Sequence, residues 1–167
     1  MKLRTIDKAI YQEHRSRIQW IMVATLFATS IGFAELYRAI FVGGESSLLL
    51  NALGVVTGVA IVTLGLFRLR DTPYFDEVHY VWQLKQELNR IYRKTQKLDA
   101  ALEAGQREAF LIKLYSLEGS RQVYELDDNT LTMSDLVRQL DELRDRIAQE
   151  GWDMSADDYR PELLEQL

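Results

Sequence analysis

Two long apolar runs, separated by a short polar turn, constrain the fold of this chain more than any other feature. The first run extends from Ile18 to Val42 and the second from Leu48 to Phe67. Each holds the roughly 20 residues that a helix needs to cross a hydrocarbon core of about 30 Å. Neither run has the alternation of barrel strands. The sequence therefore predicts a transmembrane helical hairpin that turns at Gly43–Gly44–Glu45–Ser46–Ser47.

The sequence favours this hairpin over two alternatives, a buried hairpin in a soluble protein and a cleaved signal peptide. Little of the remaining chain is apolar enough to bury two such helices. The first run is longer than the apolar core of a signal peptide, which has about 7–15 residues. Glu35 and Arg38 also lie where a signal peptide carries small neutral residues.

Basic residues flank both runs on the same side of the predicted hairpin. They are Lys2, Arg4, Lys8, Arg15 and Arg17 before the first run, and Arg68 and Arg70 after the second. The connecting turn carries Glu45 and no Lys or Arg. By the positive-inside rule, both termini are predicted to be cytoplasmic, and the basic flanks predict contact with anionic membrane lipid.

Small residues form one stripe on each predicted membrane helix. The stripes are Thr25, Ala28, Gly32, Glu35 and Ala39 on the first helix, and Asn51, Gly54, Gly58, Ile61 and Gly65 on the second. Steps of three and four residues place each stripe on one helix face, and small residues let backbones approach closely in lipid. We therefore predict helix packing through Ala28, Gly32, Gly54, Gly58 and Gly65. Packing within the hairpin is favoured over dimerisation of two chains.

Two charged residues and one amide lie within the apolar runs. Glu35 and Arg38 are three residues apart near the turn, and Asn51 should lie at a similar depth on the second helix. A charge in hydrocarbon is costly, and an ion pair with Arg38 reaching outward lowers that cost. We favour a pair that satisfies itself near the outer interface. Contact with a partner helix and a role as an ion or proton ligand remain alternatives.

The chain is predicted to be an all-α membrane protein, in which a cytoplasmic three-helix bundle or coiled-coil hairpin follows the transmembrane hairpin. Its segments are a basic cytoplasmic segment at 1–17, the hairpin at 18–70, a cytoplasmic helical domain at 71–150 and an acidic tail at 151–167. The basic segment is either an amphipathic helix at the interface or an extension of the first span. The tail either docks or becomes ordered only on binding.

Apolar spacing predicts the helices of the cytoplasmic domain. From Val81 to Leu102, apolar residues recur at steps of three and four, which predicts one helix from Pro73 to about Ala104. The next is predicted from Gln106 to about Asp127, although Gly119 and Ser120 weaken its pattern. The last begins near Thr132 or Ser134, buries Leu136, Leu140, Leu143 and Ile147, and ends at Gly151.

The sequence offers little catalytic chemistry. There is no Cys and only two His, His14 and His79, neither with a second ligand at metal-binding spacing. No phosphate-binding loop or nucleophile–base pair is recognisable, so we predict no enzymatic activity, no cofactor and no metal. An enzyme with a site around Tyr92, His79 and Asp127 is a weak third possibility. The net charge is −5 and the distal part is acidic, which argues against nucleic acid as a partner.

Four strings of sequence carry a resemblance to a known family. They are NALGVV at 51–56, RLR at 68–70, YVWQLKQELNRIYRK at 80–94 and GSRQVYELDDNTLT at 119–132. With them, nearly the whole chain resembles a family of two-span inner-membrane proteins from Gram-negative proteobacteria, catalogued as a domain of unknown function. The resemblance implies an inner-membrane location and supplies no activity. Its strings include the polar positions Gln83, Lys85, Arg90 and Tyr92, which we predict to form a partner-binding surface.

The leading functional hypothesis is therefore a non-enzymatic accessory or scaffold subunit of the bacterial inner membrane that binds another protein through its cytoplasmic helices. The alternative is a homo-oligomeric channel or transport-related assembly with Glu35, Arg38 and Asn51 at its intramembrane interface. The two hypotheses differ in whether the partner is a foreign protein or a second copy of this chain.

Overall fold

The computed structural model describes residues 2–43, 45 and 47–167, and every regular element within them is a helix. The chain forms two compact units. One is Gln12–Val78, and the other combines the described residues before Gln12 with His79–Leu167. The compact units thus have other bounds than the four sequence segments, and the C-terminal tail belongs to the same unit as the bundle.

Helix α1 extends from Lys8 to Phe41 without interruption. Its start is fixed by Asp7, whose Oδ1 accepts hydrogen bonds from the backbone N–H groups of Ala9 and Ile10 at 2.9 and 3.1 Å. This is the usual way in which an aspartate satisfies the free donors of a first helical turn. Of the two predictions for the basic segment, the structure supports an extension of the first apolar helix.

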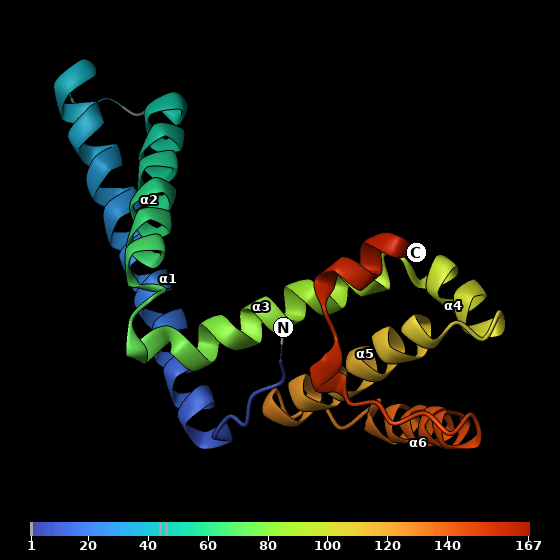
Figure 1. Cartoon of the computed structure of the whole chain (residues 1–167). Coiled ribbons are helices and arrows are strands. Elements are labelled where there is room, and N and C mark those ends of the chain that lie inside the picture. Colours follow the sequence, from blue (N-terminus) through green and yellow to red (C-terminus); the bar gives the residue numbers. More distant parts are fainter. Residues whose placement is uncertain (1, 44, 46) are drawn as a thin grey trace. The chain divides into compact units, whose positions relative to one another are not determined.

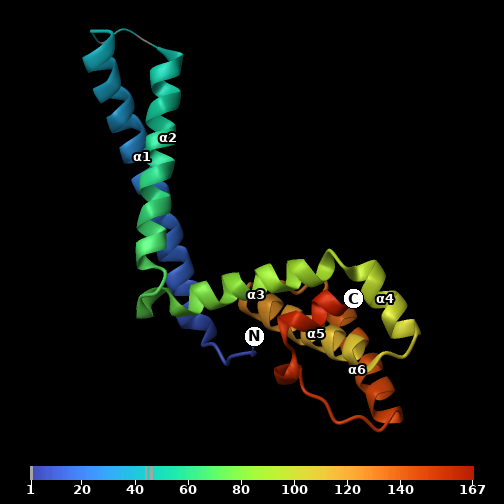
Figure 2. The same ribbon diagram turned by 45° about the horizontal axis from the view of Figure 1, so that its top comes forward.

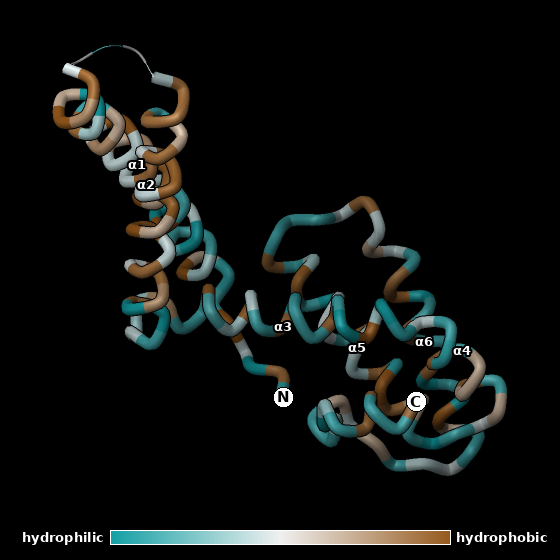
Figure 3. The backbone as a smooth tube through the Cα atoms, turned by 90° about the horizontal axis from the view of Figure 1, so that it is seen from above, coloured by the Kyte–Doolittle hydropathy of each residue, from teal (hydrophilic) through white to brown (hydrophobic). Residues whose placement is uncertain are grey.

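Helix α2 extends from Leu48 to Leu69 and lies beside α1 (Figures 1 and 2). Gly43 follows α1 with a φ of +62°, a left-handed conformation that glycine adopts without strain. Gly44 and Ser46 of the predicted turn lie outside the described residues. Both helices are long and apolar enough to cross a membrane by length and composition, and hydrophobic residues dominate α2 along its length (Figure 3).

The closest approach of α1 and α2 occurs at two glycines of α2. A Cβ atom at Gly54 would lie 2.7 Å from the backbone nitrogen of Ala34 and 2.7 Å from the carbonyl oxygen of Ser30. A Cβ atom at Gly58 would meet the Ser30 hydroxyl and would lie 3.0 Å from that of Thr29. Glycine is therefore required at both positions for the helices to pack at this distance.

The stripe predicted on α1 is displaced by about one residue from the observed one. Ala28 and Gly32 are exposed, so the prediction that they pack against α2 was wrong. A Cβ atom at Gly32 or at Gly65 would meet nothing within 4 Å. Thr29 and Ser30 take the place of Ala28 and Gly32 in the contact with α2, and a threonine hydroxyl can turn back onto its own helix. The Thr29 hydroxyl does so, donating to the Thr25 carbonyl oxygen at 2.6 Å.

After α2, a short 3-10 turn, η1 (Pro73–Phe75), leads into α3 (Asp76–Tyr92) and α4 (Thr95–Glu103). The prediction of one continuous helix to about Ala104 was wrong. The helix breaks at Arg93–Lys94, where the Thr95 hydroxyl donates to the Tyr92 carbonyl oxygen at 2.6 Å. Such side-chain bonds compete with the helical backbone ladder. The row of apolar residues at steps of three and four, which we call the seam, nevertheless continues across the break, since Leu84, Ile91 and Leu98 are all buried.

Helix α5 (Arg107–Leu126) is the centre of the bundle and packs against both α4 and α6 (Met133–Gln149). Its glycine, Gly119, lies against α3: a Cβ atom there would be 3.2 Å from side-chain carbons of Leu84 and Leu88. The predicted weak point of this helix is thus a packing contact within a continuous helix. In α6 the buried residues are Leu136, Leu140, Leu143 and Ile147, as predicted.

The C-terminal tail docks onto the bundle through two 3-10 segments, η2 (Ala156–Asp158) and η3 (Pro161–Gln166). Tyr159 and Leu164 are almost completely buried. The ring of Trp152 meets that of Phe110 edge to face, with 5.2 Å between centroids. Of the two predictions for the tail, the structure supports docking.

Candidate functional site

Helix α3 has one buried face and one exposed face that carries an unusual aromatic residue. Tyr80, Val81, Leu84 and Ile91 are buried in the bundle. Trp82, one position beyond the seam, is 56% exposed, and the ring of His79 stacks on it with 5.8 Å between centroids. Tryptophan is enriched among the residues that dominate the binding energy of protein interfaces, so this face is a candidate binding surface.

A shallow groove of about 550 Å³ runs along this face, and we call it the Trp82 groove. Its lining is Trp82, Gln83, Gln86, Glu87, Asn89 and Arg90 of α3, together with Arg93, which directly follows that helix. Gln83 is held in place by a 2.9 Å hydrogen bond between its Nε2 and the Nε2 of His79. The groove thus offers one large aromatic side, several amides and two guanidinium groups, which suits hydrogen bonding to a polypeptide.

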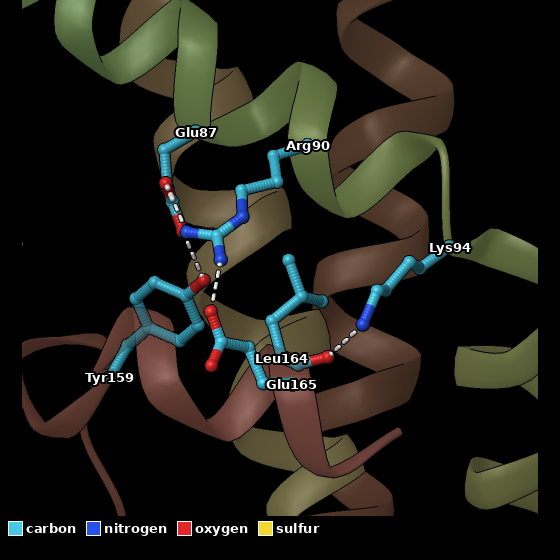
Figure 4. Close-up of polar contacts among 6 residues, drawn as sticks. All are labelled: Glu87, Arg90, Lys94, Tyr159, Leu164 and Glu165. Atoms are coloured by element: carbon cyan, nitrogen blue, oxygen red, sulfur yellow. Dashed lines mark hydrogen bonds and ion pairs between the residues drawn. The ribbon is translucent and has the colours of Figure 1, made fainter.

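The C-terminal tail contacts two residues of the Trp82 groove (Figure 4). The Tyr159 hydroxyl donates to Glu87 Oε1 at 2.5 Å, and Arg90 Nη2 donates to Glu165 Oε1 at 2.9 Å. At the end of α3, Lys94 Nζ donates to the Leu164 carbonyl oxygen at 2.5 Å. These bonds order the side chains at one end of the groove before any partner binds.

Tyr159, which makes one of these contacts, also stacks on a second tyrosine, Tyr115. The rings of Tyr115 and Tyr159 are 4.0 Å apart and nearly parallel, and both side chains are almost completely buried. Burial raises the pKa of Tyr115, and burial together with the hydrogen bond to Glu87 raises the pKa of Tyr159. Both hydroxyls therefore stay protonated at neutral pH, and the stacked rings support the docked tail.

The four residues predicted to bind a partner divide between two grooves that share Asn89. Gln83 and Arg90 line the Trp82 groove, whereas Lys85 and Tyr92 line another groove, of about 530 Å³, with residues of α5. Lys85 Nζ bonds to Asp127 Oδ2 at 2.6 Å, and the Tyr11 hydroxyl donates to the other oxygen of that carboxylate at 3.0 Å. Lys85 is therefore engaged within the bundle, while Tyr92 is 76% exposed.

The polar residues within the apolar helices are only partly brought together. Glu35 and Arg38 form an ion pair on α1, in which the Glu35 side chain is 63% exposed. Asn51 is half-buried on α2, and among the described residues no hydrogen bond or ion pair joins it to that pair. The hydroxyls that do meet across the hairpin belong to Tyr37 and Thr57, 3.0 Å apart.

Sequence reasoning did not single out Trp82, Gln86, Asn89 or Arg93. A signal was present, because Trp82 is a large aromatic residue directly next to the seam position Val81 rather than in the seam. Of the residues named for an enzyme site, His79 contacts Gln83 and Trp82, whereas Asp127 bonds Lys85 and Tyr11. The structure thus gives His79 and Asp127 different neighbours.

Fold and surface together define an all-helical protein with two helices long and apolar enough to span a membrane and an exposed aromatic groove on a third. The chain belongs to the family described as Protein of unknown function (DUF3087), which matches residues 1–164. The predicted membership in a family of unknown function is thereby confirmed over nearly the whole chain. A search of curated proteins returns no match, and neither does a search of solved structures.

Proposed function

We propose that this chain is a non-enzymatic accessory or scaffold protein of the bacterial inner membrane that binds another protein through its cytoplasmic helices. The observation that carries the proposal is the Trp82 groove. Tryptophan and arginine are the residues that most often dominate the binding energy of protein interfaces, and the groove combines Trp82 with Arg90 and Arg93. The tail contacts at Glu87 and Arg90 support it further, because a preorganised surface loses less entropy on binding.

The membrane location is supported by how the side chains of the hairpin are distributed. Large apolar residues such as Trp20, Phe27 and Leu64 face outward, while Gly54 and Gly58 are buried. An exterior of this kind is stable in lipid and costly in water. The basic residues that flank both apolar helices support cytoplasmic termini by the positive-inside rule.

The test is site-specific photo-crosslinking of the full chain in its native membrane. A photoreactive amino acid at Gln86, in the groove, should yield one discrete adduct, and the same residue at exposed Gln96 on α4 should yield none. Trp82→Ala should lower the adduct about tenfold or more, since truncating an interfacial tryptophan typically costs about 2 kcal/mol. The matched control is Tyr92→Ala, which removes an exposed aromatic from the other groove and should leave the adduct unchanged. Loss with Tyr92→Ala but not with Trp82→Ala would overturn the choice of surface.

One observation favours a second candidate, a homo-oligomeric channel or transport-related assembly. The Glu35 carboxylate is largely exposed on α1, on the same face as Ala28 and Gly32, so a second hairpin could cover it. Under this alternative, replacing Glu35 and Arg38 by Gln abolishes the oligomer seen by native mass determination in nanodiscs, or abolishes ion flux. Under the leading proposal, the same replacements leave crosslinking at Gln86 unchanged.

A further inference from the structure

The hairpin contains a groove that the packing of its two helices does not fill. A Cβ atom at Gly54 would collide with α1, whereas a Cβ atom at Gly65, further along α2, would meet nothing within 4 Å. The space left is about 330 Å³, walled by aliphatic side chains such as Ile18, Met22 and Ile61. Its walls expose almost only apolar atoms, so it suits a hydrocarbon chain.

Polar atoms without partners lie at one end of this groove. Tyr74 forms part of the groove wall, and its buried hydroxyl has no hydrogen-bond partner among the described residues. The ring of His14 lies against that of Tyr74, with centroids 4.1 Å apart, and His14 Nδ1 is 3.4 Å from Glu77 Oε2. Both of these atoms are also buried, and within the described part of the chain neither makes a hydrogen bond of acceptable geometry.

Each of these three atoms can accept a hydrogen bond, and His14 Nδ1, when it carries the proton, can instead donate to Glu77 Oε2, 3.4 Å away. A carboxylate accepts only, a neutral imidazole nitrogen without its proton accepts, and a phenol hydroxyl accepts as well as donates. Buried polar atoms in folded proteins are almost always paired, so the Tyr74 hydroxyl and the Glu77 carboxylate call for a donor beyond the described residues, either water or a ligand. A primary ammonium group carries three N–H donors and a positive charge, and Glu77 supplies the opposite charge.

Arginines lie close by in the sequence at the same end of both helices. Arg17 directly precedes the groove residue Ile18, and Arg68 and Arg70 follow the groove residue Leu66. Guanidinium groups bind phosphate oxygens, frequently through two parallel hydrogen bonds. Arg17 is paired with Glu13 at 3.0 Å and Arg70 with Asp71 at 3.4 Å, and Arg68 is the third guanidinium group at this end. The same end of the hairpin thus combines acceptors for an ammonium, guanidinium groups for a phosphate and an apolar groove.

From this combination we infer that the hairpin binds one phospholipid with a primary ammonium headgroup, a phosphatidylethanolamine. One acyl chain occupies the groove beside Gly65, and the ammonium group lies at the cluster of His14, Tyr74 and Glu77. The inference rests on the membrane location proposed above. It adds a specific lipid to the site, since phosphatidylcholine, whose quaternary ammonium has no N–H donor, satisfies none of the three acceptors.

The experiment places the full chain in nanodiscs of equal parts phosphatidylethanolamine and phosphatidylcholine with identical acyl chains, and releases it for native mass spectrometry. One phosphatidylethanolamine should remain on each chain. Glu77→Gln should bring the ratio of the two retained lipids to that supplied. Gly65→Phe should fill the groove and remove the retained lipid, while the matched control Gly32→Phe, also at an open position of an apolar helix, should keep it.

Equal retention of both lipids by the unaltered chain would overturn the inference, as would equal loss with Gly65→Phe and Gly32→Phe. A second measurement needs no substitution: phosphatidylethanolamine with a photoreactive acyl chain should label Met22 or Ile61 in preference to outward-facing Phe27 and Leu64. Uniform labelling would also overturn it. A chain that fails to enter nanodiscs would contradict the membrane proposal itself, whereas insertion without lipid preference contradicts only this inference.

Discussion

The hairpin and the helical bundle bury opposite kinds of side chain. In the bundle, Leu84 and Tyr115 are completely buried, as in the core of any water-soluble domain. In the hairpin, Gly54 and Gly58 are buried while Trp20, Phe27 and Leu64 are 72%, 65% and 66% exposed. The same chain therefore follows two packing rules, one in each of its two compact units.

The difference teaches what holds each unit together. Apolar burial away from water stabilises the bundle by about 25 cal/mol per Å² of buried apolar surface. In a hydrocarbon environment that driving force is absent, and helices associate through close backbone approach and hydrogen bonds. The hairpin has both: a close backbone approach at Gly54 and a hydrogen bond between the hydroxyls of Tyr37 and Thr57. Substitutions of the same type should therefore have unequal effects in the two units.

The largest expected effect comes from truncating one leucine in each unit. Leu84→Ala should lower the free energy of unfolding of the bundle by about 3 kcal/mol, because it leaves a cavity in a fully buried site. Leu64→Ala, on the outside of the hairpin, should leave that free energy of unfolding unchanged. The measurement is urea unfolding of the chain in micelles, followed by Trp152 fluorescence with Trp20 and Trp82 replaced by Phe. An equal loss for both variants would break the comparison.

A smaller effect is expected from enlarging a glycine of the hairpin. Gly54→Leu should cost about 2 kcal/mol of helix association, because overpacking forces the backbones apart. Spin labels at Phe27→Cys and Leu64→Cys report the separation of α1 and α2 without background, since the chain has no cysteine. The distance distribution should lengthen and broaden with Gly54→Leu and stay unchanged with Gly32→Leu. An unchanged distribution in both would show that close approach does not hold the hairpin.

The sequence predicted most of the helical order and missed two details for physical reasons. Apolar length and spacing identify both apolar helices and the buried face of α6, since these depend on long runs. The rotation of α1 is not recoverable, because small residues lie on two neighbouring faces of that helix, Ala28 and Gly32 on one and Thr29 and Ser30 on the other. The break at Arg93–Lys94 depends on the Thr95 hydroxyl and on Leu164, which is distant in sequence.

The candidate site was predicted only in part, for a related reason. Gln83 and Arg90 both line the Trp82 groove. Lys85 instead bonds to Asp127, some forty residues further along the chain. Periodicity within a helix shows which positions face outward. It does not show which outward charges are already paired with another segment, and this pairing separates Lys85 from the groove.

Tyr159 joins the C-terminal tail to Glu87 at the edge of the Trp82 groove. Tyr159→Phe should lower the free energy of unfolding of the bundle by about 1.5 kcal/mol, because it removes a hydrogen bond to a charged carboxylate. It should also weaken crosslinking at Gln86, since Glu87 and Arg90 lose one of their fixed neighbours. The same urea measurement and the same adduct test it. The hairpin distance reported by the spin labels should not change, which would keep the effect within the bundle.

The smallest expected effect comes from the other tyrosine of the stacked pair, and it has the opposite sign. The Tyr115 hydroxyl is buried without a hydrogen-bond partner among the described residues, so Tyr115→Phe should stabilise the bundle by about 1 kcal/mol at pH 7. Burial raises the pKa of Tyr115 above its ordinary value of 10.0. Above that pH the unfolded chain releases a proton that the folded chain retains, so stability falls as pH rises. The Phe variant lacks this group, and its unfolding free energy should therefore decline less steeply at alkaline pH than that of the unaltered chain. If the unfolding free energies of both chains declined equally with pH, Tyr115 would be in contact with water in the folded bundle. That result would contradict the description of the bundle as a core closed to water, in contrast to the hairpin with its exposed apolar side chains.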